Sequence, residues 1–384
     1  MIFAIQKREK EEEEMSRLWM PCFIGRLELP TRLVVTAAGE GMCDDRFHAT
    51  SRLVERYREL GKEGAAGLVI TGHAFVCPEG RRREGQISAA DDAVIEPLRA
   101  VTAAARADGS RIFLQLSHGG LCCDESLTGI PAAGPSAADR APYYAGRAMT
   151  AEETRALPGL FAAAARRAKL AGFDGVELHM AHGFLLSEFL SPFFNHREDE
   201  YGGSQENRTR LAVEIIRAVH AECGGDFPVM AKINAEDGVE GGMTIDMSLE
   251  SAGLMQEAGL DGLEVSGGFC FWKKQSDTPM KPVSLKTGKG VGYFLEAARR
   301  FHEALSIPVI AVGGIRTFET AEAVLADGDA DMAGLCRPLI RDPALARRWR
   351  RGETVASDCL SCNRCVALSR TSAGLGCPVR KEAD

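Results

Sequence analysis

Short apolar runs recur along the chain, and each is followed by a stretch whose apolar residues have helical spacing. The eight runs are residues 32–37, 67–71, 111–116, 175–179, 228–233, 262–266, 308–312 and 331–335. Several follow a Gly-x-Asp lead-in, such as Gly172-Phe173-Asp174, in which the glycine ends a helix in the left-handed conformation. Uninterrupted apolar strands are typical of parallel sheets that are covered on both faces, so the pattern predicts eight parallel strands.

Helical stretches at residues 151–170, 207–223 and 248–257 lie between these strands. Eight successive strand–helix units predict an α/β fold of the (β/α)8 TIM-barrel type, with the site at the carboxyl ends of the strands. A doubly wound sheet is the alternative, but no GxGxxG motif follows the first strand. We expect a disordered tail at 1–16, the barrel at 17–352 and a Cys-rich tail at 353–384.

Composition narrows the class of protein. The chain has 384 residues, of which 45% are hydrophobic and 26% charged, as in ordinary soluble proteins. The net charge of -8 argues against a nucleic-acid partner, and no apolar run approaches the roughly 18–20 residues of a membrane span. Residues 7–14 are almost all charged, so the N-terminus lacks the apolar core of a signal peptide. We therefore expect a cytoplasmic protein in which most of the 12 cysteines are thiols.

The residues at the predicted strand ends form a coherent set that would line one pocket. They are Thr36, Ala37, Ala38, Gly72, His73, Gln115, His179, His182, Lys232, Ser266, Gly267, Gly268, Gly313, Gly314 and Arg337. The loops after the last two strands of such barrels often bind phosphate, and here they carry Gly313-Gly314 and Cys336-Arg337. Backbone N–H groups and a guanidinium suit an anion, whereas tight turns with a surface ion pair are the alternative.

The centre of the chain resembles the Old Yellow Enzyme family of FMN-dependent NAD(P)H:flavin oxidoreductases. The resemblance rests on the block at 174–185, followed by 189–192, 195–197 and 199–208, and on residues 24–25, 29–32, 115–118, 313–315 and 337–340. It covers residues 22–350 in order.

The resemblance implies that FMN lies non-covalently over the barrel mouth, with NAD(P)H as co-substrate. The implied FMN-binding residues are Ala37, Ala38, Gly72, Gln115, Lys232, Gly313, Gly314, Cys336 and Arg337. Gln115 would bond the pyrimidine edge of the ring, and Lys232 would stabilise the anionic reduced flavin. Gly313, Gly314 and Arg337 would hold the phosphate. A plain ion-paired barrel residue is the alternative for Lys232.

His179 and His182 match the family's pair of donors to the ligand oxygen, and with Lys232 they are the expected catalytic residues. Two N–H donors on a carbonyl oxygen would lower the barrier to hydride transfer, because that oxygen gains negative charge in the transition state. The His-x-x-His spacing also suits zinc, and a purely structural pair is a further alternative.

Phe184 departs from the family, which usually has at this position a Tyr that protonates the α-carbon. A positioned general acid contributes roughly 10²–10⁴-fold, and a phenyl ring cannot supply it. Tyr143, Tyr144, Cys270 and His118 are candidate acids; alternatively, Phe184 shapes an apolar pocket.

The last four cysteines have the spacing C-x2-C-x2-C-x11-C. Cys359, Cys362, Cys365 and Cys377 suit a [4Fe–4S] cluster. The tail resembles those of trimethylamine dehydrogenase and 2,4-dienoyl-CoA reductase, although the spacings differ slightly. Zinc or plain thiols are alternatives. Because the sequence ends at Asp384 without the further domains of those enzymes, we expect electrons to be exchanged with a separate electron-transfer protein.

Four functions remain open at this point. The first is hydride transfer from reduced FMN to an α,β-unsaturated carbonyl substrate, and the second is a dehydrogenase or demethylase that passes single electrons through the cysteine tail. The third is a lyase or aldolase with Lys232 as Schiff-base nucleophile. The fourth is a non-catalytic flavin-binding module. A homo-oligomer is compatible with each of them.

Overall fold

The computed structural model describes residues 16–140, 144–269 and 292–379. The predicted disordered tail at 1–16 lies outside the described residues except for Ser16, whose hydroxyl donates to the Glu322 carboxylate. No helix in these ranges is long and apolar enough to cross a membrane.

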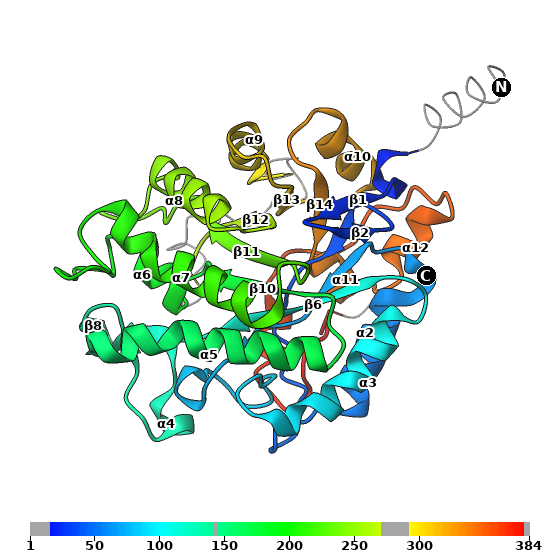
Figure 1. Cartoon of the computed structure of the whole chain (residues 1–384). Coiled ribbons are helices and arrows are strands. Elements are labelled where there is room, and N and C mark those ends of the chain that lie inside the picture. Colours follow the sequence, from blue (N-terminus) through cyan, green and yellow to red (C-terminus); the bar gives the residue numbers. More distant parts are fainter. Residues whose placement is uncertain (1–15, 141–143, 270–291, 380–384) are drawn as a thin grey trace.

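Eight parallel strands close into a barrel, which confirms the predicted fold (Figure 1). Each strand pairs with the next, and pairing of β6 with β10 closes the ring. The strands are β3 (Leu33–Val35), β4 (Leu68–Ile70), β6 (Arg111–Ser117), β10 (Gly175–Met180), β11 (Val229–Asn234), β12 (Gly262–Ser266), β13 (Val309–Val312) and β14 (Met332–Leu335). Each of the eight predicted runs therefore coincides with a barrel strand to within two residues at either end.

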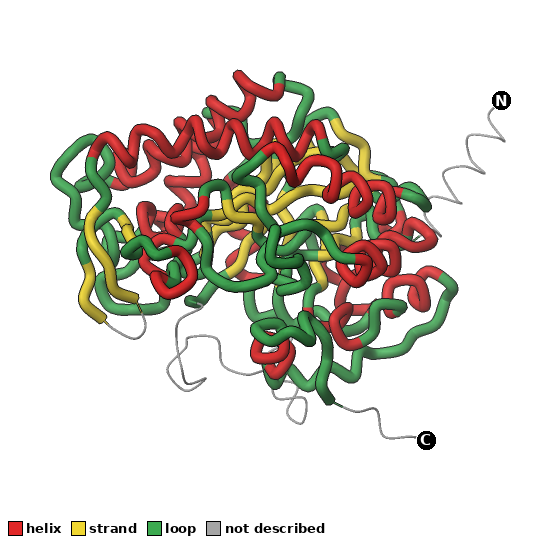
Figure 2. Tube along the Cα trace, turned by 90° about the horizontal axis from the view of Figure 1, so that it is seen from below, coloured by secondary structure: helices red, strands yellow, loops and turns green. Residues whose placement is uncertain are grey.

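Helices surround the strands, which lie at the centre of the molecule in Figure 2. The longer helices are α2 (Ser51–Gly61), α3 (Ile95–Arg106), α5 (Ala151–Leu170), α7 (Gln205–Cys223), α8 (Ile245–Glu257), α9 (Leu295–Ala304) and α10 (Phe318–Ala326). The predicted bounds of α5 are confirmed. Helices α7 and α8 begin two and three residues earlier than predicted, because the side chains of Ser204 and Thr244 cap their first N–H groups.

Shorter elements lie in the loops and at the ends of the chain. The helices are α4 (Glu125–Thr128), α6 (Leu185–Leu190), α11 (Arg337–Arg341), α12 (Leu345–Arg350) and α13 (Arg364–Leu368), and the strands are β5 (Ala74–Phe75), β7 (Ala133–Gly134), β8 (Ala138–Arg140) and β9 (Tyr144–Ala148). Single 3₁₀ turns are η1 (Arg17–Trp19), η2 (Lys62–Gly64), η3 (Pro78–Gly80), η4 (Asp92–Val94) and η5 (Gly120–Cys122).

An antiparallel hairpin closes the amino-terminal end of the barrel. It consists of β1 (Cys22–Ile24) and β2 (Leu27–Leu29). Ile24 and Leu29 are fully buried in one cluster with strand residues that include Phe113, Met230 and Ile310. This end of the barrel is filled with apolar side chains, which leaves the opposite end, at the carboxyl ends of the strands, as the place for a polar site.

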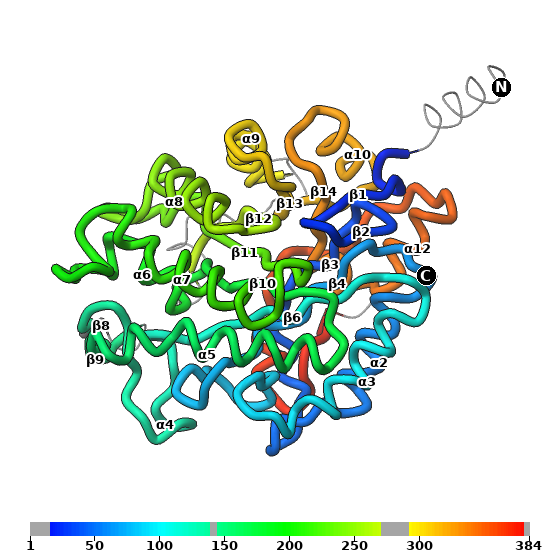
Figure 3. The backbone as a smooth tube through the Cα atoms, viewed as in Figure 1, coloured from blue at the N-terminus to red at the C-terminus, as the bar shows by residue number. Residues whose placement is uncertain are grey.

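The C-terminal segment packs on the same body as the barrel. Cys365 and Leu375 form a buried cluster with Ile340, and Ala38 and Met42 pack against it. In Figure 3 the red C-terminal tube passes beside the blue tube of the N-terminal part of the chain. The Leu375 N–H also donates to the Glu40 carbonyl, with 2.7 Å between the two atoms. The predicted Cys-rich tail therefore contacts the loop that follows the first barrel strand.

Candidate active site

The histidine pair stands where β10 ends. The two ring centroids of His179 and His182 lie 5.1 Å apart. His182 Nε2 lies 2.9 Å from Ser266 Oγ on β12, and its backbone N–H donates to Asn234 Oδ1 at 3.1 Å. His182 also has φ +65°, a left-handed conformation that is uncommon for residues with a Cβ and is often found at functional sites. The contact of Ser266 with the ring and that of Asn234 with the backbone N–H thus hold His182 in this conformation.

Both histidines are neutral at pH 7. Burial lowers the pKa of His179 well below its usual range, and the charges of His182, His73, Lys232 and Arg82 act in the same direction. Burial, Lys232 and Arg82 lower the pKa of His182 to about 3. The Nδ1 atom of His179 is buried and bonds to no other group in the described part of the chain. A neutral imidazole with a buried, unpartnered nitrogen is suited to a ligand oxygen.

Lys232 belongs to a buried network inside the barrel. Its Nζ lies 2.5 Å from Glu264 Oε1, and Gln115 Nε2 donates to Glu177 Oε2 at 2.6 Å. Burial acts to lower the pKa of Lys232, but the Glu264 and Glu177 carboxylates outweigh it and raise that pKa. Burial, followed by the charge of Glu264, raises the pKa of Glu177 well above its usual range. Lys232 is therefore charged, in the ion pair considered as its alternative role.

The residues expected to hold the phosphate lie together after β13 and β14. Gly313 and Gly314 have φ +98° and +79°, and a Cβ on Gly313 would lie 2.5 Å from the Tyr293 ring. Arg337 donates to Asn363 Oδ1 at 2.9 Å and to the Tyr293 hydroxyl at 2.7 Å. Among the described residues no carboxylate pairs with Arg337. A half-buried guanidinium with only neutral partners fits an anionic group.

The other expected FMN-binding residues also lie around the barrel mouth, but they differ in their hydrogen bonds and neighbours. The Gly72 N–H donates to Glu40 Oε1 at 2.8 Å and to the Tyr57 hydroxyl at 3.0 Å, so this N–H is already engaged. Cys336 Sγ lies 3.9 Å from the Ala37 carbonyl oxygen. Ala38 packs at the edge of the cluster that contains Cys365.

Phe184 forms a wall of the site. Its ring centroid lies 4.3 Å from that of His179 and 4.9 Å from that of His73. Among the candidate acids, His118 is buried with its pKa lowered to about 4 by burial, and its Nδ1 accepts the Gly120 N–H. Tyr144 packs its ring against Phe193 and Phe194. Tyr143 and Cys270 lie outside the described residues.

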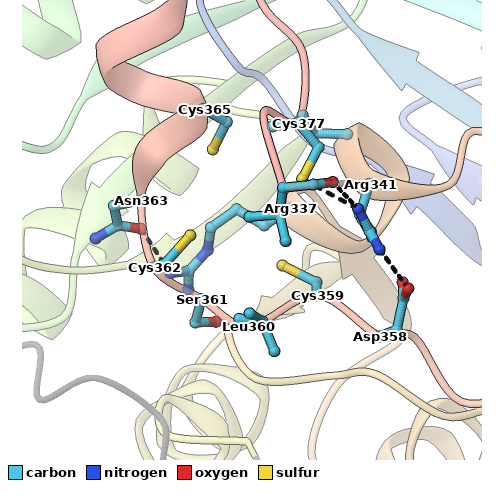
Figure 4. Close-up of a pocket in the computed structure, with 12 residues that line it drawn as sticks. Arg337, Arg341, Asp358, Cys359, Leu360, Ser361, Cys362, Asn363, Cys365 and Cys377 are labelled. Atoms are coloured by element: carbon cyan, nitrogen blue, oxygen red, sulfur yellow. Dashed lines mark hydrogen bonds and ion pairs between the residues drawn. The ribbon is translucent and has the colours of Figure 1, made fainter. Parts of the chain in front are cut away.

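The four tail cysteines line one pocket. Figure 4 shows the thiols of Cys359, Cys362, Cys365 and Cys377 around a common space, with Arg337 and Arg341 beside them. Within the described ranges, no three His, Cys, Asp or Glu side chains gather closely enough to hold a single metal ion. The thiols therefore share a pocket without converging on one point.

Comparison with known proteins identifies the class of this site. The NADH:flavin oxidoreductase / NADH oxidase family matches residues 17–355. The chain belongs to this family. Membership confirms the expectation of a flavin oxidoreductase barrel related to Old Yellow Enzyme.

Relatives within the family are similar over nearly the whole chain. A metal reductase of Desulforamulus reducens is 32% identical over 372 residues, which are 96% of this chain and 54% of the relative. A cinnamate reductase of Clostridium sporogenes is 32% identical over 396 residues, 96% of this chain and 58% of the relative. A solved structure of 2-naphthoyl-CoA reductase superimposes with a TM-score of 0.87 at 27% identity, covering 94% of this chain and 56% of the other. The chain thus spans about half the length of these relatives.

Sequence reasoning missed parts of the site in this family member. Glu177 and Glu264 each interrupt an apolar run, as in Val176-Glu177-Leu178, and a charge inside a buried strand was a readable signal. Arg82 was not readable in the same way, because it lies in a loop among four basic or acidic neighbours.

Proposed function

We propose that this chain forms an FMN-dependent NAD(P)H oxidoreductase site that transfers hydride to an α,β-unsaturated carbonyl compound. The observation that carries the proposal is the neutral pair His179 and His182 at the barrel mouth, with a buried His179 Nδ1 that makes no hydrogen bond within the described chain. When bound, FMN supplies the chemistry of accepting a hydride from NAD(P)H and delivering one to the substrate. The cinnamate reductase relative is, by its name, a reductase of a conjugated acid, which supports this reaction type.

Different residues of the chain have different roles in the proposed reaction. His179 and His182 donate hydrogen bonds to the substrate oxygen, and these bonds strengthen as that oxygen gains charge. Lys232, kept charged by Glu264, would stabilise the anionic reduced form of a bound flavin. Gly313, Gly314 and Arg337 hold the phosphate. Phe184 packs against His179 and transfers no proton, so the α-carbon receives its proton from another acid or from water.

We propose further that Cys359, Cys362, Cys365 and Cys377 hold a [4Fe–4S] cluster. All four line one pocket, and their C-x2-C-x2-C-x11-C spacing suits such a cluster. Arg341 Nη1 lies 3.7 Å from Cys377 Sγ, and a cationic neighbour stabilises thiolate charge. This pocket supports a second candidate function, a dehydrogenase that passes single electrons to a partner protein.

Ligand titration of the purified yellow protein tests the proposed function. We expect His179→Ala with His182→Ala to weaken binding of a phenol, followed by the flavin absorbance, by about 10- to 100-fold without loss of FMN. His220→Ala, in the last turn of α7 outside the pocket, is the control and should change neither property. Unchanged phenol affinity in the double variant would remove the anchoring role, and the absence of enone-dependent NAD(P)H oxidation would refute the reaction.

A further inference from the structure

Arg82 packs on Phe184, the residue whose ring lies against His179. Its guanidinium carbon lies 5.2 Å from the centre of the Phe184 ring. That ring lies 4.3 Å from His179, whose ring lies 5.1 Å from His182. Although burial is the largest cause, the charge of Arg82 also lowers the pKa of both histidines. The guanidinium is therefore within electrostatic range of the proposed carbonyl-binding pair.

Hydrogen bonds connect the loop that carries Arg82 to residues that line the site. The Arg82 N–H donates to Gln86 Oε1 at 2.9 Å, and Gln86 Nε2 lies 2.9 Å from His73 Nδ1. Gln86 is buried, and His73 packs edge-on against Phe184 at 4.9 Å. The backbone of Arg82 is thus anchored to side chains that form the wall of the pocket.

Three consecutive arginines in this loop point to different neighbours. Arg81 lies over Phe47, with 4.8 Å between its guanidinium carbon and the ring centre. Arg83 contacts His73 Nε2 at 3.2 Å and Ser369 Oγ at 3.1 Å. Of the three, Arg82 is the one that packs on Phe184, at the position where the family usually has its Tyr.

A charge argument indicates what Arg82 recognises. Neutral His179 and His182 supply hydrogen bonds to an oxygen but no positive charge, and Lys232 is paired with Glu264. A carboxylate that enters a buried site is costly unless a cation meets it. A guanidinium binds a carboxylate with two parallel hydrogen bonds, and it cannot act as a general acid because its pKa exceeds about 12.

We propose that Arg82 is a specificity residue and that the substrates of this site are α,β-unsaturated carboxylates. The inference rests on the proposed function. One carboxylate oxygen lies on His179 and His182, and Arg82 meets the negative charge. Hydride, supplied ultimately by NAD(P)H, forms a C–H bond at the β-carbon. The π-electron pair moves onto the carboxyl group, which carries a second negative charge until a proton from water reaches the α-carbon. Arg82 stabilises that added charge.

Matched ligands separate charge recognition from pocket shape. The oxidised, FMN-loaded protein is titrated with 3-phenylpropanoate and with the neutral 3-phenylpropanamide, and the flavin absorbance reports binding. We expect the wild type to prefer the acid, and Arg82→Gln to weaken acid binding by about 10- to 100-fold while amide binding changes less than about threefold. Higher ionic strength should weaken acid binding in the wild type.

Two variants serve as controls. Arg82→Lys keeps the charge and should retain most of the preference for the acid, whereas Arg81→Gln removes a neighbouring guanidinium and should behave as wild type. Equal losses of acid and amide binding in Arg82→Gln would overturn the inference, as would a wild type that does not prefer the acid. FMN content and the thermal midpoint of each variant exclude a folding defect.

Turnover of 2-cyclohexen-1-one distinguishes failure of the Arg82 assignment from failure of the proposed function. If the wild type reduces this neutral enone but shows no preference for acids, the assignment of Arg82 fails and the proposed function stands. If neither the enone nor cinnamate supports NAD(P)H oxidation, the proposed function itself fails.

Discussion

At the scale of single residues, the site contains residues whose pKa or backbone conformation differs from that of the same residue in an unfolded chain. His73 and His179 are buried and His182 is partly buried, and all three have lowered pKa values, with desolvation as the largest cause for each. His182 also holds a left-handed backbone conformation. Such residues persist only where the surroundings define them strongly, and this strain is consistent with a ligand-binding role.

These histidines make the protein sensitive to acid. The unfolded chain binds protons at histidine below about pH 6.5, whereas folded His182 does so only near pH 3, so stability falls as pH falls between these values. We expect His182→Gln to reduce the loss of unfolding free energy between pH 7 and pH 5 by about 1–2 kcal/mol, measured by urea denaturation. Replacement of the exposed His196 by Gln is the control. An identical pH dependence in His182→Gln and wild type would contradict this assignment.

At the scale of elements, three adjacent strands determine the charge beneath the mouth. The Cα register places His179 of β10 opposite Lys232 of β11, and Lys232 opposite Glu264 of β12. Residues that face one another in parallel strands point to the same side, so one layer inside the barrel holds the histidine and the ion pair. The carboxylate of Glu264 therefore controls how much positive charge Lys232 presents.

Removal of the Glu264 carboxylate should change the midpoint potential of the bound flavin. In Glu264→Gln the Glu264 charge no longer opposes burial, so the pKa of Lys232 falls, and a neutral Lys232 stabilises the anionic reduced flavin less. The two-electron midpoint potential should therefore fall by about 30 mV or more. The same change leaves the buried Lys232 without its ion-pair partner and should cost about 3–5 kcal/mol of stability. Spectroelectrochemistry measures the potential. Asp329→Asn, which breaks the Arg299 ion pair away from the mouth, should leave it unchanged. A constant or higher potential in Glu264→Gln would be inconsistent with this role.

At the scale of the whole molecule, the C-terminal segment and the proposed flavin site meet at one residue. Arg337 follows β14 beside the glycine loop, and it also lines the cysteine pocket and donates to Asn363 of the tail. Arg316 extends the contact, because its guanidinium donates to the Cys359 carbonyl and to the Ser361 hydroxyl. An electron donor or acceptor in the pocket would therefore lie close to the phosphate end of FMN.

A single cysteine replacement tests this connection. We expect wild-type protein purified without oxygen to contain about four iron atoms per chain, and Cys362→Ser to lose most of them while it keeps FMN. The rate with a one-electron acceptor should fall with the iron, whereas hydride transfer to an enone should persist. Cys223→Ser, a buried cysteine at the end of α7, is the control. Wild-type protein that contains zinc and no iron would refute the cluster.

The sequence by itself determined the barrel and most of the ring of residues around its mouth. Strand runs, glycine lead-ins and capping residues are local signals, so the eight strands and the bounds of α5 could be read directly. Parallel strands that all end at one face bring their last residues together, which is why His179, Lys232 and Arg337 could be grouped.

The ion pairs and charge contacts of the residues around the barrel mouth could be determined only from the tertiary structure. The pairing of Lys232 with Glu264 depends on the register between strands, and the packing of Arg82 on Phe184 depends on the path of a loop. The position of Arg337 between the glycine loop and the cysteine pocket depends on how the tail folds back. Spacing along a chain carries little information about contacts between distant segments, because those contacts form only when the whole core packs.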